Sequence, residues 1–595
     1  MAMMRRCPVV LVVAAMAACT DGPVGPTPTG PAAVVIAPDS LVFGALGSAV
    51  TLTASVVDSN GAALDVPVAW SHHGFGVVSV SDSGVVTALA DGVDTVYATA
   101  GSLTGHLVAR VHQIGTNLAI ATHPAVLTYL GQTFQLRAIV TDSNGNLLNA
   151  DSVTWQSSHP EAIRVADGLV TAADIGTAMI SATSGTRTAS ATLAVRITGP
   201  SGVGDAVLDH TVQCVAFRAG VFPCDGVDLV AYVPLGGVGA SGTVHLNDMW
   251  GWTDPSDGIE YAIVGRYDGT AFLSLADPQH PRYLGYLPMT SGAHANYWRD
   301  IKVYQNHAYI VADGAGPHGM QVFDLTSLRN VTQPPAVFHA VTTYTGVASV
   351  HNLAIDTATG FAYLVGANGG GTTCGGGLHM VDIRSPEQPT FAGCFQDLTT
   401  GRSGTGYTHD AQCVIYSGPD VTYQGREICF GSNETALSIA DVTDKTTPVA
   451  VSHMAYPSVA YAHQGWLSED QRYFFTNDEL DEYDGYVATT RTLIWDVSDL
   501  TDPVLAHQYY GPTDATDHNN YVVGDVLYAS NYQFGIRLIG IATPTAPVQL
   551  GFFDTAPEQD NVPGFGGSWS NYPFFASGII AVTSSEEGLF ILRRH

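Results

Sequence analysis

Short runs of alternating apolar and polar residues fill most of the chain, and turn-forming dipeptides separate them. Residues 56–64 read VVDSNGAAL and residues 140–148 read VTDSNGNLL, with an Asn-Gly pair between two apolar runs in each. Alternation with a period of two places side chains on the two faces of a strand, and Asn-Gly is a strong signal for a tight hairpin. The pattern therefore predicts an all-β chain that is rich in antiparallel hairpins.

Residues 33–112 and 117–197 repeat one pattern. Asp58 corresponds to Asp142 at an offset of 84 residues, and Trp70 corresponds to Trp155 at an offset of 85 residues. A domain of this size made of short strands is expected to be a β-sandwich, with its tryptophan in the core. Both repeats resemble the bacterial Ig-like domains of group 2. The resemblance implies spacers or weak adhesion modules, and we see no catalytic chemistry in them.

A longer repeating unit begins at about residue 205. A strand followed by the turn D-x-[TSR]-x-x-x-x-P recurs at 378–389, 437–448 and 493–503. Aligning the strand-like run that opens each unit gives seven starts, spaced by 52, 52, 58, 54, 55 and 51 residues: NDMWGW (247–252), RDIKVY (299–304), HNLAID (351–356), HDAQCV (409–414), HQGWLS (463–468), HNNYVV (518–523) and WSNYPF (569–574). Each unit has room for four strands, and radial repetition of four-stranded sheets is a β-propeller. Residues 205–595 are therefore predicted to form a seven-bladed β-propeller.

The two ends of this region complement each other. The last unit ends after its third strand, at Leu592, while an extra strand-like run at 227–233 precedes the first full unit. A strand from the start of the domain can complete the last sheet and remove two exposed sheet edges. A right-handed solenoid is the alternative architecture, but it does not predict this complementary shortfall.

The repeats and several longer stretches carry a family resemblance. The turn-and-strand units, such as LHMVDI (378–383), resemble LVIVD repeats. A larger set resembles the bacterial choice-of-anchor B family: it includes FPCDGVDL (222–229), GYTHDAQCVIYSGPD (406–420), HQGWLSEDQRYFFTNDELDE (463–482) and DHNNYVVGDVLYASNY (517–532). That resemblance covers roughly 205–595 and implies an exported or surface protein with a propeller-like domain. It implies no known reaction.

The N-terminus is typical of an export signal. Arg5 and Arg6 precede the apolar run PVVLVVAAM (8–16), which is too short to span a bilayer permanently. Residues 16–19, MAAC, resemble a bacterial lipobox, which implies a signal peptide over 1–19 and a lipid on Cys19. The Pro/Gly-rich linker at 20–32 fits a tether behind a membrane anchor. A plain signal peptide, in which Cys19 is incidental, is the alternative.

Composition and cysteine usage narrow the compartment and the partners. Asp and Glu number 53 against 22 Lys and Arg, a formal net charge of −31, so nucleic acid is not expected as a partner. The acidity serves solubility or, alternatively, attraction for cations. Outside the signal region six cysteines remain, and proximity in sequence predicts the disulfides Cys214–Cys224, Cys374–Cys394 and Cys413–Cys429.

The first two residues of the seven aligned starts are the candidate site. In a propeller the first strand of each blade lines the central channel, so these residues are expected to form a ring at one rim. Four of the seven first positions are histidine. The ring consists of Asn247-Asp248, Arg299-Asp300, His351-Asn352, His409-Asp410, His463-Gln464, His518-Asn519 and Trp569-Ser570.

Three interpretations of this ring compete. The first is a structural belt, in which the polar side chains satisfy backbone groups of the neighbouring blade. The second is cation or ligand binding, because neutral imidazoles and carboxylates are metal ligands. Against it, a sevenfold channel is expected to hold the histidines too far apart for one ion. The third is acid–base catalysis by one histidine. Adjacent strand residues point to opposite faces, so His409 and Asp410 are not expected to form a dyad.

An acidic loop offers a second, weaker metal candidate. Asp478, Glu479, Asp481 and Glu482 lie within NDELDE (477–482) and carry oxygen ligands suited to Ca²⁺, although the spacing is not that of an EF-hand. A solvated acidic loop is the equal alternative. No G-x-S-x-G, H-E-x-x-H or P-loop motif is present in the sequence.

Two hypotheses of function follow. The first is an exported, lipid-anchored binding or scaffold protein at the cell surface or in the periplasm, whose Ig-like spacers present the propeller to an extracellular protein or glycan. The second is a hydrolase or lyase that uses the histidine-lined mouth, with Ca²⁺ or another divalent cation as a possible cofactor. In both, the ring residues Asp248, Arg299, Asp300, His351, His409, His463, His518 and Trp569 are the ligand-binding candidates, and no residue is assigned a catalytic role.

Overall fold

The computed structural model describes residues 29–148, 152–560 and 562–595. Within these ranges the regular elements are β-strands and four short 3-10 turns, so the all-β prediction is confirmed: the turns are Leu235–Val238, Leu325–Asn330, Cys374–Gly376 and Arg402–Gly404. None of the described residues belongs to a helix long and apolar enough to cross a bilayer. The predicted signal peptide with Cys19, and the linker up to residue 28, lie outside the described residues.

The first of the two repeats starts at Pro31, two residues before the predicted boundary. Its ten strands are β1 (Pro31–Ala37), β2 (Ser40–Phe43), β3 (Ala49–Thr51), β4 (Thr53–Asp58), β5 (Ala63–Leu64), β6 (Ala69–His72), β7 (Val78–Val80), β8 (Val85–Ala88), β9 (Gly92–Ala100) and β10 (Leu103–Val111). The main sheet has the order β2-β10-β9-β6. Its core is built from alternate valine, leucine and alanine side chains, and the half-buried Trp70 packs against it.

The second repeat has the same architecture. Its strands are β11 (Asn117–Ile120), β12 (Val126–Leu127), β13 (Thr133–Gln135), β14 (Ala138–Thr141), β15 (Thr154–Ser157), β16 (Ile163–Ala166), β17 (Leu169–Ala172), β18 (Gly176–Ser184) and β19 (Arg187–Val195). The order β12-β19-β18-β15 reproduces that of the first repeat, including the parallel pairing of the edge strand. The sequence repeat is therefore a structural repeat.

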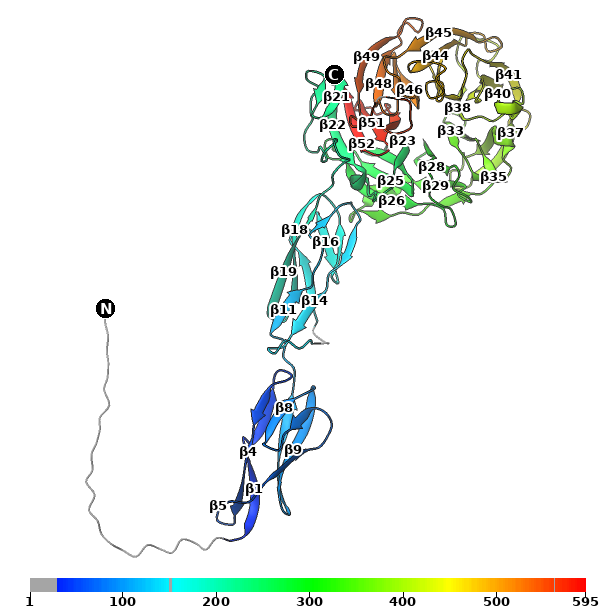
Figure 1. Cartoon of the computed structure of the whole chain (residues 1–595). Helices are drawn as coiled ribbons and strands as arrows, with labels where there is room; N and C mark the ends of the chain where they lie inside the picture. The colour runs from blue at the N-terminus through cyan, green and yellow to red at the C-terminus, as the bar shows by residue number, and fades with distance from the viewer. Residues whose placement is uncertain (1–28, 149–151, 561) are drawn as a thin grey trace, which may run out of the picture. The chain divides into compact units, whose positions relative to one another are not determined.

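The described residues after 205 form seven sheets of four to six strands, antiparallel except for the pairing of β26 with β30 (Ala336–Val337), and one two-stranded sheet of β32 (Val347–Ser349) and β35 (Asn368–Gly371). Figure 1 shows the seven larger sheets around a common centre, and we call this region the ring domain. The innermost strands are β23 (Leu246–Thr253), β27 (Arg299–Tyr304), β33 (Asn352–Asp356), β38 (Asp410–Ile415), β42 (Ala462–Leu467), β46 (Asn520–Val523) and β50 (Ser568–Tyr572). Each contacts the innermost strand of the next sheet, and β50 contacts β23. Each starts within two residues of a start aligned from the sequence.

The outer strands of the ring domain follow in chain order. The second strands are β24 (Glu260–Arg266), β28 (His307–Ala312), β34 (Phe361–Val365), β39 (Glu427–Ser432), β43 (Tyr473–Asp478), β47 (Val526–Ser530) and β51 (Ile579–Ser584). The third are β25 (Gly269–Ser274), β29 (Met320–Asp324), β36 (Leu378–Asp382), β40 (Leu437–Asp441), β44 (Arg491–Asp496), β48 (Ile536–Gly540) and β52 (Gly588–Arg594). The outermost are β26 (Arg282–Pro288), β31 (Thr342–Tyr344), β37 (Thr390–Phe395), β41 (Val449–Met454), β45 (Val504–Tyr510) and β49 (Val548–Phe553).

The seventh sheet takes its outermost strand from the start of the domain. Strand β22 (Val227–Pro234) pairs antiparallel with β52, from Val227 opposite Arg594 to Pro234 opposite Gly588. The prediction that residues 227–233 complete the last sheet is confirmed. This pairing covers the open edge of the last sheet and joins the two ends of the domain by main-chain hydrogen bonds.

The recurring D-x-[TSR] turn has a local cause. The Asp441 carboxylate accepts hydrogen bonds from the backbone N–H and the hydroxyl of Thr443, at 3.0 and 2.6 Å. The Asp496 carboxylate likewise accepts the Ser498 N–H at 3.0 Å. An aspartate that binds the backbone two residues on ends a strand and starts a turn. The motif therefore marks the exit of the third strand in several of the sheets.

The described residues hold three disulfide bonds, and they are the three pairs predicted: Cys214–Cys224, Cys374–Cys394 and Cys413–Cys429. Cys413 lies directly opposite Cys429 on the first and second strands of one sheet, with Cα atoms 4.0 Å apart. This bond therefore braces an innermost strand against the sheet behind it.

Candidate metal centre

The first residues of the innermost strands surround a cavity of about 250 Å³ at one mouth of the ring domain, and we call it the histidine mouth. Eight of the predicted ring residues line it: the first positions Arg299, His351, His409, His463, His518 and Trp569, and the second positions Asn352 and Asn519. Three tyrosine and tryptophan side chains complete much of the wall: Trp298, Tyr407 and Tyr461. The sequence alignment thus brings together residues that are up to 270 positions apart in the chain.

The four histidine rings stand in a row. The ring centroids are 4.3 Å apart between His351 and His409, 4.3 Å between His409 and His463, and 4.5 Å between His463 and His518. The expectation that a sevenfold channel keeps them too far apart for one ion is therefore wrong. That expectation assumed that the strands carrying the histidines lie far apart. Four consecutive innermost strands are instead neighbours, and their histidine side chains all turn towards the cavity.

Each of three rings is held through its Nδ1 atom. The Nδ1–H of His409 donates to the backbone oxygen of His463 at 2.8 Å, and that of His518 donates to the backbone oxygen of Trp569. His463 Nδ1 lies 3.1 Å from Asn477 Oδ1. The bonds of His409 and His518 join neighbouring sheets, whereas that of His463 lies within one sheet. In the tautomer that they fix, Nε2 carries the lone pair, and in His409 this atom lies 2.7 Å from His351 Nε2. The structural and ligand-binding interpretations are therefore compatible.

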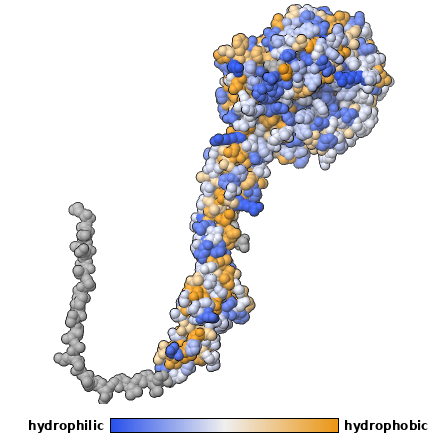
Figure 2. All heavy atoms as spheres, in the orientation of Figure 1, coloured by the Kyte–Doolittle hydropathy of each residue, from blue (hydrophilic) through white to orange (hydrophobic). Residues whose placement is uncertain are grey.

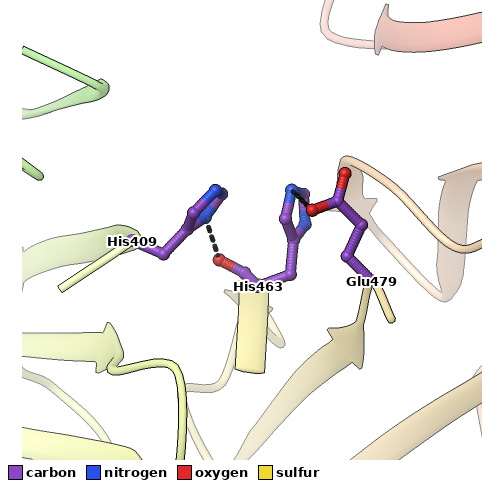
Figure 3. A group of neighbouring side chains, drawn as sticks. All are labelled: His409, His463 and Glu479. Atoms are coloured by element: carbon purple, nitrogen blue, oxygen red, sulfur yellow. Dashed lines mark hydrogen bonds and ion pairs between the residues drawn. The ribbon is translucent and has the colours of Figure 1, made fainter. Parts of the chain in front are cut away.

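Glu479 completes a set of converging ligands (Figure 3). Its carboxylate oxygens lie 3.9 Å from His463 Nε2 and 3.8 Å from His518 Nε2, and the Tyr532 hydroxyl donates to it at 2.7 Å. One ligand atom from each of His409, His463 and Glu479 lies within 4.8 Å of the other two. Two imidazoles and one carboxylate are an established ligand set for Zn²⁺.

Burial sets the protonation of these groups. It lowers the pKa of His409 and of His463 well below the ordinary value, and it lowers the pKa of His518 to about 3. It raises the pKa of Glu479 to about 7, because a buried carboxylate loses hydration. The histidines are thus neutral, as metal ligands must be, while the carboxylate favours a nearby positive charge.

His351 stands at the end of the histidine row with a carboxylate behind it. Its Nδ1 lies 3.0 Å from Asp313 Oδ2, and its Nε2 lies 2.7 Å from His409 Nε2. Asp313 also accepts hydrogen bonds from Ser349 and Asn368. Although burial alone raises the pKa of Asp313, these hydrogen bonds hold it well below the usual range. A carboxylate–histidine pair therefore lies beside the cluster.

Of the second residues of the aligned starts, Asn352 and Asn519 line the histidine mouth, whereas the three aspartates have other roles. Asp248 and Asp300 both lie against the Lys302 ammonium, with a distance of 3.6 Å from Asp248 Oδ2 to Lys302 Nζ. They do not line the histidine mouth. Asp410 lines a second cavity, so His409 and Asp410 serve different spaces and form no dyad.

The four carboxylates of the acidic loop do not share one set of partners; Asp481 and Glu482 lie against each other and, with Asp517, form a buried group. Asp478 accepts hydrogen bonds from the Tyr456 hydroxyl and from three backbone N–H groups, while Asp481 pairs with Arg491. Glu482 lies among other buried carboxyls, and burial raises its pKa to about 12. Glu479 alone of the four reaches the histidine mouth. The four carboxylates of this loop therefore have different partners, and the calcium site stays a prediction.

Asp313 is absent from the sequence predictions, and Glu479 is predicted only as part of the acidic loop, apart from the histidines. Asp313 follows the second strand β28, and Glu479 follows the second strand β43. The second strand of each sheet runs back to the rim from which the first strand starts. The residue just after the second strand therefore lies at the histidine mouth. An acidic residue at this position of the sequence repeat could thus have been predicted to belong to the site.

Comparison with known proteins identifies part of the chain. Residues 119–195 match the family model of the bacterial Ig-like domain (group 2). Over 147 residues the chain is 27% identical to Ice-binding protein 1 of Shewanella frigidimarina (strain NCIMB 400); this stretch is 24% of the chain and 16% of that protein. The chain thus covers far less than two thirds of this relative.

Solved structures show only distant likeness. A protein from Lactobacillus plantarum is 13% identical over 57% of this chain and 88% of its own, with a TM-score of 0.36. Domains 4 and 5 of the S-layer protein SbsC are 18% identical over 28% of this chain and 98% of their own, with a TM-score of 0.16.

The predicted Ig-like domain at 117–197 is confirmed by the family match. Together with the disulfide bonds, it indicates an extracellular or surface protein, because disulfides persist in oxidising compartments.

Proposed function

We propose that the chain is an exported binding protein whose ring domain is a seven-bladed β-propeller with a divalent metal centre in the histidine mouth. The proposal includes a lipid on Cys19 that anchors the protein to a membrane, and two Ig-like spacers behind an LVIVD-type propeller. It also includes recognition of an extracellular protein or glycan by the propeller. The choice-of-anchor B resemblance and the linker at 20–32 support the anchor.

One observation carries the metal centre: ligand atoms of His409, His463 and Glu479 lie within 4.8 Å of one another. Nitrogen-rich ligand sets select zinc and its transition-metal neighbours over calcium, which takes oxygen ligands. His518 and His351 stand next to the set and are the nearest further nitrogen ligands. We therefore propose a zinc-type cation and not calcium.

Metal analysis of the purified full-length protein tests this proposal. We expect about one Zn²⁺ per chain after equilibration with zinc, and an affinity loss of more than about 100-fold in the double variant His409→Ala/His463→Ala. His453→Ala is the matched control, because this histidine lies on the outer strand β41 away from the mouth. Sub-stoichiometric zinc in the wild type, or equal zinc in the double variant, would reject the centre.

A second candidate function is metal-assisted hydrolysis. The ligand set has three members and opens on a cavity, which is the arrangement in which zinc keeps a bound water. A cation held by these residues would lower the pKa of a bound water to about 7 and so supply a nucleophile. The His351–Asp313 pair lies close enough to the cluster to hold or accept a proton.

Hydrolysis of p-nitrophenyl acetate and bis-p-nitrophenyl phosphate separates the two functions. Turnover that depends on zinc and is lost in Glu479→Gln supports the hydrolase. Stoichiometric zinc without turnover of either compound supports a binding function, in which the cation holds a ligand or the mouth itself in place.

A further inference from the structure

A second cavity lies at the opposite ends of the same innermost strands, and we call it the aromatic mouth. Its volume is about 340 Å³, within the range of small-molecule sites. All seven residues at the fourth position of the aligned starts line it: Trp250, Lys302, Ala354, Gln412, Trp466, Tyr521 and Tyr572. Strands rise about 3.3 Å per residue, so these side chains lie about 10 Å from the histidine mouth along each strand.

Aromatic rings make one side of this mouth. Trp250 packs edge-to-face against Tyr572 with centroids 5.2 Å apart, and Trp466 packs edge-to-face against Tyr521 at 5.0 Å. Phe574 lies within 6.0 Å of all four rings. Mutual packing of this kind fixes the ring planes before a ligand arrives, which lowers the entropy cost of binding.

Amide and carboxyl groups make the other side. Gln412 Oε1 accepts the Leu467 N–H at 2.7 Å, and Gln464 Oε1 accepts the Asn520 N–H at 2.9 Å. These bonds set the orientation of both amides. Within the described ranges, neither NH₂ group has a hydrogen-bond partner in the protein, and neither is sealed from the cavity. Two fixed donors are therefore available to a ligand.

Asp410 adds an acceptor to the same side. Its Oδ1 accepts the Ala411 N–H at 2.6 Å, while its second oxygen has no hydrogen bond to the described part of the chain. The carboxyl group thus faces the mouth with one oxygen open. The polar side as a whole presents both donors and an acceptor within one small space.

The floor of the mouth carries little net charge. The Lys302 ammonium lies 4.6 Å above the Trp250 ring and forms an ion pair with Asp300. Burial opposes ionisation of Asp300, and the ammonium overcomes it, so the pKa of Asp300 is lowered. Burial raises the pKa of Asp248 well above the ordinary value, which favours its neutral form. A strongly charged ligand therefore finds no unpaired counter-charge at the floor.

We propose that the aromatic mouth binds a pyranose ring of a neutral oligosaccharide. One face of such a ring presents C–H groups that pack on Trp250 and Trp466, and its hydroxyl groups both donate and accept. The amides of Gln412 and Gln464 and the carboxyl of Asp410 match those hydroxyls. The proposal rests on the proposed binding function of an exported protein, but it requires no metal.

Tryptophan fluorescence and calorimetric titration with maltotriose, cellotriose and chitotriose test it. The full-length protein is titrated in the presence of EDTA, so that failure of the metal centre does not affect the outcome. We expect saturable binding of at least one of the three sugars and a loss of about tenfold or more in affinity in Trp466→Ala. Tyr510→Ala, on the outer strand β45, is the matched control and is expected to bind as the wild type does.

A second variant distinguishes weaker sugar binding from a folding defect. Gln412→Ala keeps all the aromatic rings and removes one amide donor, so it is expected to weaken binding by several-fold with an unchanged melting temperature. Failure of all three sugars to bind overturns the proposal. Equal binding by Trp466→Ala and the wild type overturns it as well. Competition by tetramethylammonium instead of sugar would identify the mouth as a cation cage and would also overturn it.

Discussion

The first and fourth residues of the innermost strands lie on the same seven β-strands, yet the two mouths that they line differ in chemistry. The histidine mouth has imidazoles and a carboxylate whose nitrogen and oxygen atoms converge within 4.8 Å. The aromatic mouth has flat rings, amides and a neutralised floor. Between them, Asp248 and Asp300 hold Lys302 in the channel.

The difference shows that the side chains, and not the repeated backbone, determine the chemistry of each mouth. The seven sheets share one arrangement of strands around the centre, and the residue at a given position of the innermost strand differs from sheet to sheet. A histidine repeated in four consecutive strands places four rings within contact of each other. Aromatic residues at four of the seven fourth positions do the same at the other end. The fold supplies the spacing, and the chosen residues supply two separate chemistries.

The largest expected effect concerns the charges between the mouths. Replacing Lys302 with Met leaves Asp300 buried without its partner, so we expect a loss of about 3–5 kcal/mol in the free energy of unfolding at neutral pH. Zinc binding per folded molecule is expected to persist, because Lys302 does not line the histidine mouth. Urea unfolding of variant and wild type measures the loss. A change below about 1 kcal/mol would show that the ion pair is not a structural requirement.

The loss of stability in Lys302→Met is expected to depend on pH. In the wild type the pKa of Asp300 is lowered from 3.8, so its contribution to stability is complete above that value and is lost as the pH falls further. Without the ammonium, burial dominates and both Asp248 and Asp300 favour protonation. The destabilisation of Lys302→Met should therefore be largest at alkaline pH and shrink as the pH falls towards about 5. A destabilisation that is constant with pH would contradict this.

The next effect comes from the disulfide that braces the aromatic mouth. Removing Cys413–Cys429 by a double alanine substitution opens a loop with a sequence separation of 16 residues, and we expect a loss of about 3 kcal/mol in stability. Because Cys413 lines the aromatic mouth, the sugar affinity should fall as well, while the zinc affinity stays within about twofold. Removal of Cys214–Cys224, which lines neither mouth, is the control. Equal effects of both removals on sugar binding would contradict the local role.

A smaller effect is expected at the histidine mouth. Tyr532 donates its hydroxyl hydrogen bond to Glu479 at 2.7 Å and so fixes the carboxylate of the proposed metal centre. Tyr532→Phe should lower the zinc affinity by about tenfold, as is usual when a partner of a ligand is removed. The sugar affinity should not change. If the zinc affinity of the variant matched that of the wild type, Glu479 would be positioned by the metal alone or would not be a ligand.

The sequence predicts the strands and turns of this protein well, because these elements depend on residues that are close together in the chain. Starts of the innermost strands, the hairpins and the Asx turns depend on residues close together in the chain, such as Asp441 and Thr443. The pairing of β22 with β52 is the exception, and it was predicted because a missing strand at one end matches an extra one at the other. The disulfides follow from closeness in sequence.

The site was predicted less completely, for a physical reason. The alignment identifies the four histidines, but their separation depends on side-chain directions and on the packing of neighbouring sheets. Glu479 was assigned to an acidic loop, although its strand ends at the rim of the histidine mouth. The fourth-position aromatics are visible in the aligned starts, and only the structure shows that Trp250 and Trp466 face one cavity with open amides.

The smallest expected effect is the coupling between the two mouths. They share strands but no lining residue. Sites without shared partners are usually additive within about 0.5 kcal/mol, so zinc should change the sugar affinity by less than about twofold. Titration of the sugar with zinc-loaded and EDTA-treated protein measures this directly. Trp466→Ala should leave the zinc affinity unchanged for the same reason. A coupling of tenfold would show that the innermost strands move together as the metal binds, and the ring domain would then be a switch in which each mouth reports on the other.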